Sequence, residues 1–436
     1  MSGVVVYPGV LSGRVALPGD KSVSQRVAML ASLACGTSEV TGYLDGEDAQ
    51  STLAAMVALG ALVERKPDGV ICITGVGGAL RVPSEPLDLG NSGTGTRLLA
   101  GLLAGAGVRA TVVGDASLSR RPMGRIEKPL ALMGADLQLT GERGTLPMVI
   151  AGGDLKGIRY EMPMASAQVK SCVLLAGLFA EGETTVVEPR PTRDHTEKLF
   201  EMFGIPVRVE GRCVSVMGCG AAGPVFAGRA VRVPGDFSSA AFWLVAAAAR
   251  EGAVIEMEGV GLNPRRTALL DVLKRMGADV DVVPEVVMGD PVGRLRVRGA
   301  VLRGTVIEGD EIPNLIDELP ILAVAGALAM GETVIRDAAE LRVKESDRIA
   351  EMVKHLRSFG VSVDEFEDGM RVQGGAVLKT PAGPLLSEGD HRIAMSMAIL
   401  NTFADGALRL DEVGCVDTSY PSFWKVLVSW GGRVDR

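Results

Sequence analysis

The residues best suited to chemistry lie in the stretch Leu341–Ala350, which contains Lys344, Glu345 and Arg348. The pattern predicts a helix start, on which Lys344 and Arg348 share one face and Glu345 borders it. Two cations on one face repel each other unless an anion lies between them, and a helix N-terminus adds partial positive charge. We therefore expect an anion-binding pocket that contains one carboxylate. The alternative, a solvated and charged helix start, is the commoner origin of such a run.

Polar residues also cluster where strongly apolar helical segments begin. For any single one of these stretches, N-capping is the favoured interpretation, because Ser, Asn and Asp are ordinary caps. Taken together, helix starts that carry donors or cations would form a strong anion site if they converged. The stretches are Lys21–Arg26, Gly90–Arg97, Ser166–Lys170, Asp317–Glu318 and Asp390–Arg392.

Two loops add to this set. Gly90–Gly95 holds three glycines, which permit close backbone approach to a phosphate or carboxylate, although a structural turn is an equal interpretation. The loop Asp115–Arg125 leads into a helix and suits phosphate or carboxylate binding better than the alternative, a basic surface loop. Its cations are Arg120, Arg121 and Arg125.

The elements that must position these residues recur six times along the chain. Each repeat contains an amphipathic helix that ends in a glycine suited to a left-handed C-cap, followed by a strand. These glycines are Gly60, Gly134, Gly204, Gly277, Gly360 and Gly431. Each repeat also contains a more apolar helix, which should be buried. The predicted buried helices are Ser24–Cys35, Thr96–Ala104, Gln168–Ala180, Ser238–Arg250, Ile316–Met330 and His391–Phe403.

Six units of about seventy residues favour two globular domains of three units each. The similar stretches Pro18-Gly-Asp-Lys21 and Pro234-Gly-Asp-Phe237 each follow a strand and precede a buried helix, so they mark the expected crossovers. We expect an N-terminal domain over residues 19–233. The C-terminal domain then comprises residues 1–18 and 234–436, with a first strand over Gly3–Leu17.

Composition limits the function. The chain has 436 residues with 47% hydrophobic and 22% charged residues, as in an ordinary globular protein. A net charge of −8 argues against general affinity for nucleic acid. Six scattered cysteines and three histidines argue against a zinc cage and favour a reducing compartment. Without a signal-peptide pattern or an apolar run long enough to span a bilayer, we expect a cytoplasmic protein.

Taken together, the motifs closely resemble the 5-enolpyruvylshikimate-3-phosphate synthase family, and the Ser166–Lys170 and Thr192–Glu197 stretches resemble its second, bacterial class. The matching stretches span nearly the whole chain in the family's order. They are Pro18–Ser22, Gly90–Gly95, Arg121–Arg125, Ser166–Lys170, Thr192–His195, Asp317–Glu318, Arg342–Arg348 and Asp390–Arg392.

The resemblance implies an α/β fold of two similar domains, each of three βαβαββ repeats, described as an inside-out α/β barrel. It implies transfer of the enolpyruvyl group of phosphoenolpyruvate to the 5-hydroxyl of shikimate-3-phosphate, with release of phosphate, in the shikimate pathway to chorismate and aromatic amino acids. It implies no cofactor and no metal, and a monomer is expected.

The resemblance also implies the site residues. Shikimate-3-phosphate would be held by Lys21, Ser22, Arg26, Ser166, Ala167, Gln168, Arg193, Asp317 and Lys344. Phosphoenolpyruvate would be held by Lys21, Gly93, Thr94, Arg121, Gln168, Arg348 and Arg392. Asp317 is the family's candidate base for the 5-hydroxyl and Glu345 its candidate proton donor to C3, with Lys21 close to both; whether Lys21 or Glu345 makes that transfer stays open.

Two positions depart from the family's pattern, and a third bears on inhibition. Ala167 stands where much of the family has a second Ser, and Thr418 stands where the first class commonly has a Lys for phosphoenolpyruvate. Gly93 lacks the methyl of tolerant second-class members, so sensitivity to the inhibitor glyphosate is expected.

Two rival functions remain at this point. The sister enolpyruvyl transferase that acts on UDP-N-acetylglucosamine usually carries a reactive Cys in the loop that corresponds to Asp115–Arg125, and none is present. A non-catalytic anion-binding scaffold would gain nothing from carboxylates such as Asp317 and Glu345 in its pocket.

Overall fold

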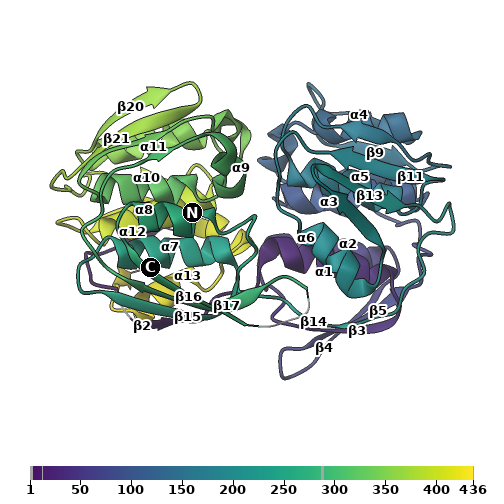
Figure 1. Ribbon diagram of the computed structural model, residues 1–436, viewed down its shortest axis with the longest axis horizontal. Helices are drawn as coiled ribbons and strands as arrows, with labels where there is room; N and C mark the ends of the chain where they lie inside the picture. Colours follow the sequence, from purple (N-terminus) through teal and green to yellow (C-terminus); the bar gives the residue numbers. More distant parts are fainter. Residues whose placement is uncertain (1–2, 12, 286–288, 436) are drawn as a thin grey trace. The chain divides into compact units, whose positions relative to one another are not determined.

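The computed structural model describes residues 3–11, 13–285 and 289–435, and it divides into two compact units (Figure 1). The N-terminal unit comprises Gly19–Pro234, joined by Gly289 and Asp290, and the C-terminal unit comprises the remainder. Each unit has its own apolar core. The observed division lies one residue beyond the expected 19–233 boundary and places the short segment at Gly289 and Asp290 with the other half.

The N-terminal unit contains three four-stranded sheets. The first repeat has α1 (Lys21–Leu33), β3 (Cys35–Thr41), α2 (Glu47–Ala58), β4 (Leu62–Arg65) and β5 (Ile71–Val76), and its sheet is completed by β14 (Ala230–Arg232). The second has β6 (Leu87–Asp88), α3 (Gly93–Gly105), β7 (Ala110–Val113), η1 (Leu118–Arg120), α4 (Gly124–Met133), β8 (Asp136–Leu139) and β9 (Met148–Ala151). The third has β10 (Arg159–Glu161), α5 (Ala167–Gly177), β11 (Glu183–Val187), α6 (His195–Phe203), β12 (Val207–Glu210) and β13 (Cys213–Met217).

The C-terminal unit repeats this order. Its first repeat has β2 (Gly13–Val15), α7 (Phe237–Ala248), β15 (Val254–Gly261), α8 (Ala268–Arg275), β16 (Asp279–Glu285) and β17 (Val292–Arg298). The second has β18 (Val306–Ile307), η2 (Gly309–Glu311), α9 (Ile312–Leu315), α10 (Leu319–Leu328), β19 (Gly331–Ile335), η3 (Ala339–Val343), α11 (Arg348–Ser358), β20 (Ser362–Phe366) and β21 (Gly369–Gly374). The third has β22 (Leu385–Leu386), α12 (His391–Asn401), β23 (Leu408–Asp411), η4 (Val413–Thr418), α13 (Phe423–Ser429) and β24 (Val434–Asp435), and its sheet is completed by β1 (Val4–Val6).

All six sheets share one topology. In each, the first strand pairs parallel to the second, which pairs antiparallel to the fourth, which in turn pairs antiparallel to the third, as in β6-β7-β9-β8. The predicted α/β class with six βαβαββ repeats is therefore confirmed. Within the described ranges the strands form six separate sheets, and no closed strand barrel is found among them.

The apolar helices α1, α3, α5, α7, α10 and α12 are buried along nearly their whole length, as predicted. The glycines expected to follow the amphipathic helices all have positive φ, from +76° at Gly204 to +113° at Gly60. This left-handed conformation is the one that a C-cap glycine adopts without strain.

Three expectations about elements were wrong. The first strand, predicted over Gly3–Leu17, is two short strands, β1 and β2, in different sheets. The helix predicted over Ile316–Met330 is shorter: α10 covers Leu319–Leu328, because Pro320 favours a helix start at its first turn, and α9 lies before the predicted range. Five of the six buried helices also end earlier than predicted; α1, for example, ends at Leu33, because β3 begins at Cys35.

Candidate active site

The N-terminal turns of α1, α3 and α5 meet inside the N-terminal unit. Gln25 on α1 donates to the Ser92 hydroxyl that caps α3, at 2.5 Å. Gln168 on α5 donates to Thr94 Oγ1 at 2.9 Å and accepts from Arg97 Nη1 at 2.6 Å. Three of the polar helix starts noted in the sequence therefore lie together within this unit, which sums their partial positive charge at one place.

Lys21 opens α1 and forms an ion pair with Asp48 in the first turn of α2, with Nζ to Oδ2 at 2.8 Å. Both side chains are largely buried, which strengthens their electrostatic interaction. Asp20 caps α1 through the Val23 amide, so the N-capping interpretation also holds here. Asp48 was not singled out from the sequence, because its role depends on a contact across 27 residues.

Arg26 is buried on α1 and its guanidinium is fixed on several sides. Nε donates to Thr196 Oγ1 at 2.7 Å, Nη2 to Ser171 Oγ at 2.8 Å and Nη1 to the Ser22 carbonyl at 2.9 Å. Burial lowers the pKa of Arg26 to about 10, and the Glu197 carboxylate opposes that shift. The side chain is thus held ready as a cationic hydrogen-bond donor rather than as a mobile surface arginine.

Gly93 begins α3 directly beside two arginines. A Cβ at this position would lie 3.1 Å from Arg121 Nη1 and 3.1 Å from Arg97 Nη1. Arg121 is buried and donates to Asn91 Oδ1 at 2.6 Å, whereas Arg120 in the same loop is exposed. Among the arginines of the loop Asp115–Arg125, Arg121 therefore contacts the glycine-rich turn.

The starts of α5 and α6 supply further predicted residues of this unit. Ser166 caps the helix through the Val169 amide at 3.3 Å, and Ala167 is its first residue. Arg193 precedes α6 and is partly exposed. Together with Lys21, Arg26, Arg97 and Arg121, it gives this unit a cationic cluster that suits phosphate and carboxylate groups.

In the C-terminal unit, Arg348 lies at the centre of a carboxylate cluster and is 1% exposed. Nη2 donates to Glu345 at 2.6 Å, Nε to Asp390 at 2.8 Å and Nη1 to Asp317 at 3.3 Å. Burial works against the charged form, but the three carboxylates outweigh it and raise the pKa of Arg348 well above its ordinary value. Arg348 is therefore a permanent cation that gathers both predicted catalytic carboxylates.

The helical arrangement predicted for Lys344 and Arg348 was wrong. Asp347 caps α11 through the Ala350 amide, so the helix begins at Arg348, while Lys344 has extended backbone before it. Lys344 instead pairs with Glu340 at 3.6 Å. The two cations therefore have different carboxylate partners.

A second chain of polar contacts runs through the starts of α7, α10 and α12. Ser238 bonds to Glu318, the residue before α10, and Arg392 Nη1 lies 4.0 Å from the same carboxylate. Arg266 Nη2 donates to Ser238 at 2.5 Å, and its Nη1 lies 3.8 Å from Asp317. Asp390 and Arg266 were not assigned roles from the sequence; the signal present was that acidic residues precede buried helices.

The two clusters differ in their chemistry. The N-terminal cluster is rich in cations and backbone amides, which bind anions. The C-terminal cluster combines arginines with carboxylates, so it can both hold an anion and exchange protons. Most of the predicted site residues belong to one of these two clusters, whereas Lys344, next to Glu345 in sequence, pairs with Glu340.

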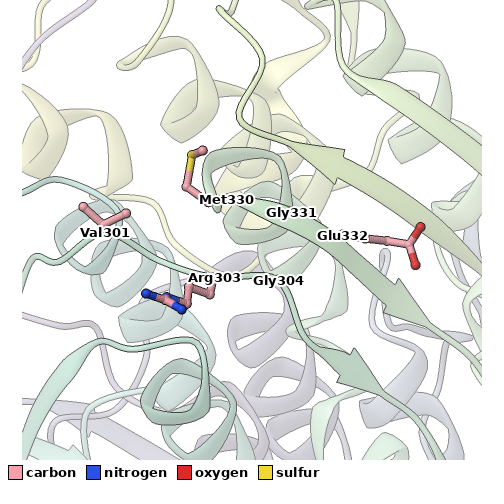
Figure 2. A pocket seen from close by; sticks show the side chains of 6 residues that line it. All are labelled: Val301, Arg303, Gly304, Met330, Gly331 and Glu332. Carbon is pink, nitrogen blue, oxygen red and sulfur yellow. The ribbon is translucent and has the colours of Figure 1, made fainter.

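A pocket of about 470 Å³ lies elsewhere in the C-terminal unit (Figure 2). It is lined by Val301, Arg303, Gly304, Met330, Gly331 and Glu332, none of which is a predicted site residue. In the described part of the chain, no group of three or more His, Cys, Asp or Glu is arranged to hold a metal ion. No helix among the described residues is long and apolar enough to cross a membrane.

Comparison with known proteins gives a consistent result. The sequence model of the family described as EPSP synthase (3-phosphoshikimate 1-carboxyvinyltransferase) matches residues 6–427. Curated 3-phosphoshikimate 1-carboxyvinyltransferases of Akkermansia muciniphila and Desulforamulus reducens are 50% and 48% identical, and each comparison covers 96% of this chain and at least 96% of the relative.

Solved structures agree. EPSP synthase from Acinetobacter baumannii superimposes with a TM-score of 0.87 at 44% identity, over 100% of both chains. The enolpyruvyl transferase NikO from Streptomyces tendae has a TM-score of 0.79 at 18% identity, over 99% of this chain and 98% of the other, which supports the fold alone.

Proposed function

The chain belongs to the EPSP synthase family, and from this premise we propose that the two polar clusters are the substrate-binding and catalytic parts of the enzyme. As a 3-phosphoshikimate 1-carboxyvinyltransferase (EC 2.5.1.19), it transfers the enolpyruvyl group of phosphoenolpyruvate to the 5-hydroxyl of shikimate-3-phosphate and releases phosphate, in the shikimate pathway.

For shikimate-3-phosphate, the proposed residues are Lys21, Ser22, Arg26, Ser166, Ala167, Gln168, Arg193, Asp317 and Lys344. The fixed guanidinium of Arg26 and the buried Lys21 supply the charge that a phosphate and a carboxylate need. Ser166 supplies a hydroxyl at the start of α5. Ala167 has no hydroxyl, so this position contributes only its backbone and methyl.

For phosphoenolpyruvate, the proposed residues are Lys21, Gly93, Thr94, Arg121, Gln168, Arg348 and Arg392. Gly93 leaves room beside Arg121, which a side chain would narrow. Arg348 and Arg392 supply planar guanidinium groups suited to carboxylate and phosphate. Thr418 is buried in η4 and carries no charge, so no lysine contact is proposed there.

The single observation that best supports the chemistry is that Asp317 and Glu345 both accept hydrogen bonds from Arg348. We propose that Asp317 takes the proton of the 5-hydroxyl as the hydroxyl oxygen attacks C2 of phosphoenolpyruvate, and that Glu345, with Lys21 as the alternative group, gives a proton to C3. Loss of phosphate from C2 and return of one C3 proton to a base then restore the double bond between C2 and C3 and give the enol ether product. General acid–base help of this kind contributes ~10²–10⁴-fold, so positioning and charge stabilisation must supply the rest.

Three further properties are proposed. Six cysteines without disulfides favour a reducing compartment, so we place the enzyme in the cytoplasm. We also propose that the enzyme acts as a monomer. Glyphosate is proposed to compete with phosphoenolpyruvate beside Gly93.

Phosphate release from phosphoenolpyruvate, measured with two acceptors, tests the proposal. We expect release with shikimate-3-phosphate and none with UDP-N-acetylglucosamine. Release with the UDP-sugar would favour the sister transferase, and release with neither acceptor would favour an anion-binding scaffold.

A further inference from the structure

A buried ion cluster lies in the N-terminal unit outside the set of proposed substrate-binding residues. Lys170 Nζ lies 2.7 Å from Glu197 Oε1 and 3.1 Å from Glu188 Oε1. The Lys170 side chain is 0% exposed, and the two carboxylates are 2% and 3% exposed. Burying three charged groups costs free energy unless each group is paired, so the distances within this cluster must stay short.

The place of Lys170 in its helix adds to this cost. It lies in the first turn of α5, where the partial positive charge of the helix N-terminus disfavours a cation. Glu197, in the first turn of α6, is on the other hand favoured by its helix. The two carboxylates therefore offset the cost of burying the Lys170 ammonium group. What Lys170 does follows from the other residues that these two carboxylates contact.

Both carboxylates lead to residues proposed to bind shikimate-3-phosphate. Glu188 accepts hydrogen bonds from the Thr192 amide, at 3.0 Å, and from the Thr192 hydroxyl, directly before Arg193. Glu197 follows Thr196, whose hydroxyl receives Arg26 Nε. Lys170 itself precedes Ser171, whose hydroxyl receives Arg26 Nη2 and also bonds to Thr196 at 2.7 Å.

We propose that Lys170, through Glu188 and Glu197, is a positioning residue for shikimate-3-phosphate. It ties α5, the end of β11 and the start of α6 together, and so fixes Arg26 and Arg193 in place. This inference rests on the proposed function, in which those two arginines hold that substrate. Lys170 does not touch substrate in this account.

The electrostatics predict what happens when the charge is removed. Lys170→Met leaves Glu188 and Glu197 buried without the cation that balances their charge. Glu197 would then attract the guanidinium of the neighbouring Arg26 and draw it away from Thr196 and Ser171. Displacement of a binding group by about 1 Å costs up to ~10²-fold. The loss should fall on shikimate-3-phosphate, because the contacts of the cluster lead to Arg26 and Arg193, which are proposed to hold that substrate and not phosphoenolpyruvate.

The experiment measures KM for each substrate and kcat in Lys170→Met, in the double variant Lys170→Met/Glu197→Gln and in Glu188→Gln. Lys198→Met, a change at a partly exposed residue on the same helix as Glu197, is the matched control. We expect the KM for shikimate-3-phosphate to rise about 10- to 100-fold in Lys170→Met while the KM for phosphoenolpyruvate changes less than threefold. Charge balance in the double variant should recover most of the loss, and Lys198→Met should behave as the unchanged enzyme.

Three outcomes would overturn the inference: equal effects on both KM values, a lower melting temperature with neither KM changed, or no recovery in the double variant. If Lys170→Met does not fold, Glu188→Gln decides, with a selective rise in the shikimate-3-phosphate KM supporting the inference and its absence overturning it. The variant Arg26→Gln distinguishes a failure of this inference from a failure of the proposed function. If it leaves that KM unchanged, the proposed binding role of Arg26 fails; if it raises that KM while the cluster variants do not, only the inference fails.

Discussion

At the scale of single residues, the clearest geometric constraint is at Gly93. A methyl group there would approach the Nη1 atoms of Arg121 and Arg97 to 3.1 Å, which is closer than ordinary van der Waals contact. Because both neighbours are the ends of flexible side chains, the guanidinium groups can shift by a few tenths of an ångström without disturbing the fold.

Gly93→Ala should therefore alter binding rather than stability. We expect the KM for phosphoenolpyruvate to rise about 10-fold and glyphosate inhibition to weaken by at least as much, with little change in the KM for shikimate-3-phosphate. Gly124→Ala is the matched control, since its methyl would meet only Glu127 Oε2 at 3.9 Å. Equal effects of the two substitutions on steady-state kinetics would contradict this assignment of Gly93.

Asp48 gives a second prediction at the same scale. Asp48→Asn keeps an oxygen near Lys21 but removes the charge that balances its largely buried ammonium group. Because Lys21 is proposed to contact both substrates, kcat/KM should fall ~10- to 100-fold for each of them. The exposed Asp45→Asn is the control, and a loss confined to one substrate would show that Lys21 does not serve both.

At the scale of elements, helix packing in the N-terminal unit depends on Gly101. A Cβ at this position of α3 would lie 2.1 Å from the Cys172 carbonyl oxygen on α5, and backbone atoms cannot move aside at low cost. The same two helices carry Thr94 and Gln168, so their close approach also sets the site.

Gly101→Ala should destabilise the N-terminal unit by about 3 kcal/mol. Gly153→Ala, where a Cβ meets nothing within 4 Å, should be nearly neutral. Urea unfolding followed by circular dichroism measures both variants. An equal free energy of unfolding for the two would show that α3 and α5 adjust more easily than the structure implies.

A second prediction at this scale concerns His355, which is buried on α11 and lies 3.0 Å from the Leu386 carbonyl through Nε2. Burial, reinforced by Lys354, lowers the pKa of His355 to about 4, from the ordinary 6.5. Since the unfolded chain then binds the proton more readily, stability should fall as the pH drops through 6.5 towards 4. The full loss is about 3 kcal/mol below that range.

Unfolding free energies at pH 7 and pH 4.5 test this. The unchanged protein should lose more stability over that interval than His355→Gln, which cannot titrate there. Parallel losses in the two proteins would assign the pH dependence to other groups.

Much of the element order could be predicted because it depends on local signals. Glycines after amphipathic helices and polar caps before apolar ones mark positions where the backbone itself has a strong preference. The break between Lys344 and Arg348 was missed because Asp347 caps the helix within a charged run that also has helical spacing. Asp48 was missed, and Asp390 was given no role, because their contacts join elements distant in sequence.

At the scale of the whole molecule, the crossovers explain why the N-terminal strands belong to the C-terminal unit. The Pro18 carbonyl accepts from the Asp236 amide within the C-terminal unit, and the Pro234 carbonyl accepts from the Asp20 amide within the N-terminal unit. Asp20 and Asp236 then cap α1 and α7. The repeated Pro-Gly-Asp motif allowed these two crossovers to be predicted from the sequence.

The two units also differ in the chemistry of their polar clusters. Each unit brings the starts of three buried helices together, but the N-terminal unit presents mainly cations and the C-terminal unit presents arginines with carboxylates. Sequence alone could predict which residue types cluster; it could not predict that Arg348 contacts Asp317, Glu345 and Asp390 at once, because those contacts arise from packing of α10, α11 and α12.

The most direct test is the rate of phosphate release at saturating phosphoenolpyruvate and shikimate-3-phosphate in Asp317→Asn and Glu345→Gln, with the exposed Glu332→Gln as control. If these carboxylates perform the proton transfers, each substitution should lower kcat by at least ~10²-fold while Glu332→Gln leaves it unchanged. Near-normal kcat in either Asp317→Asn or Glu345→Gln would contradict the catalytic role assigned to that residue.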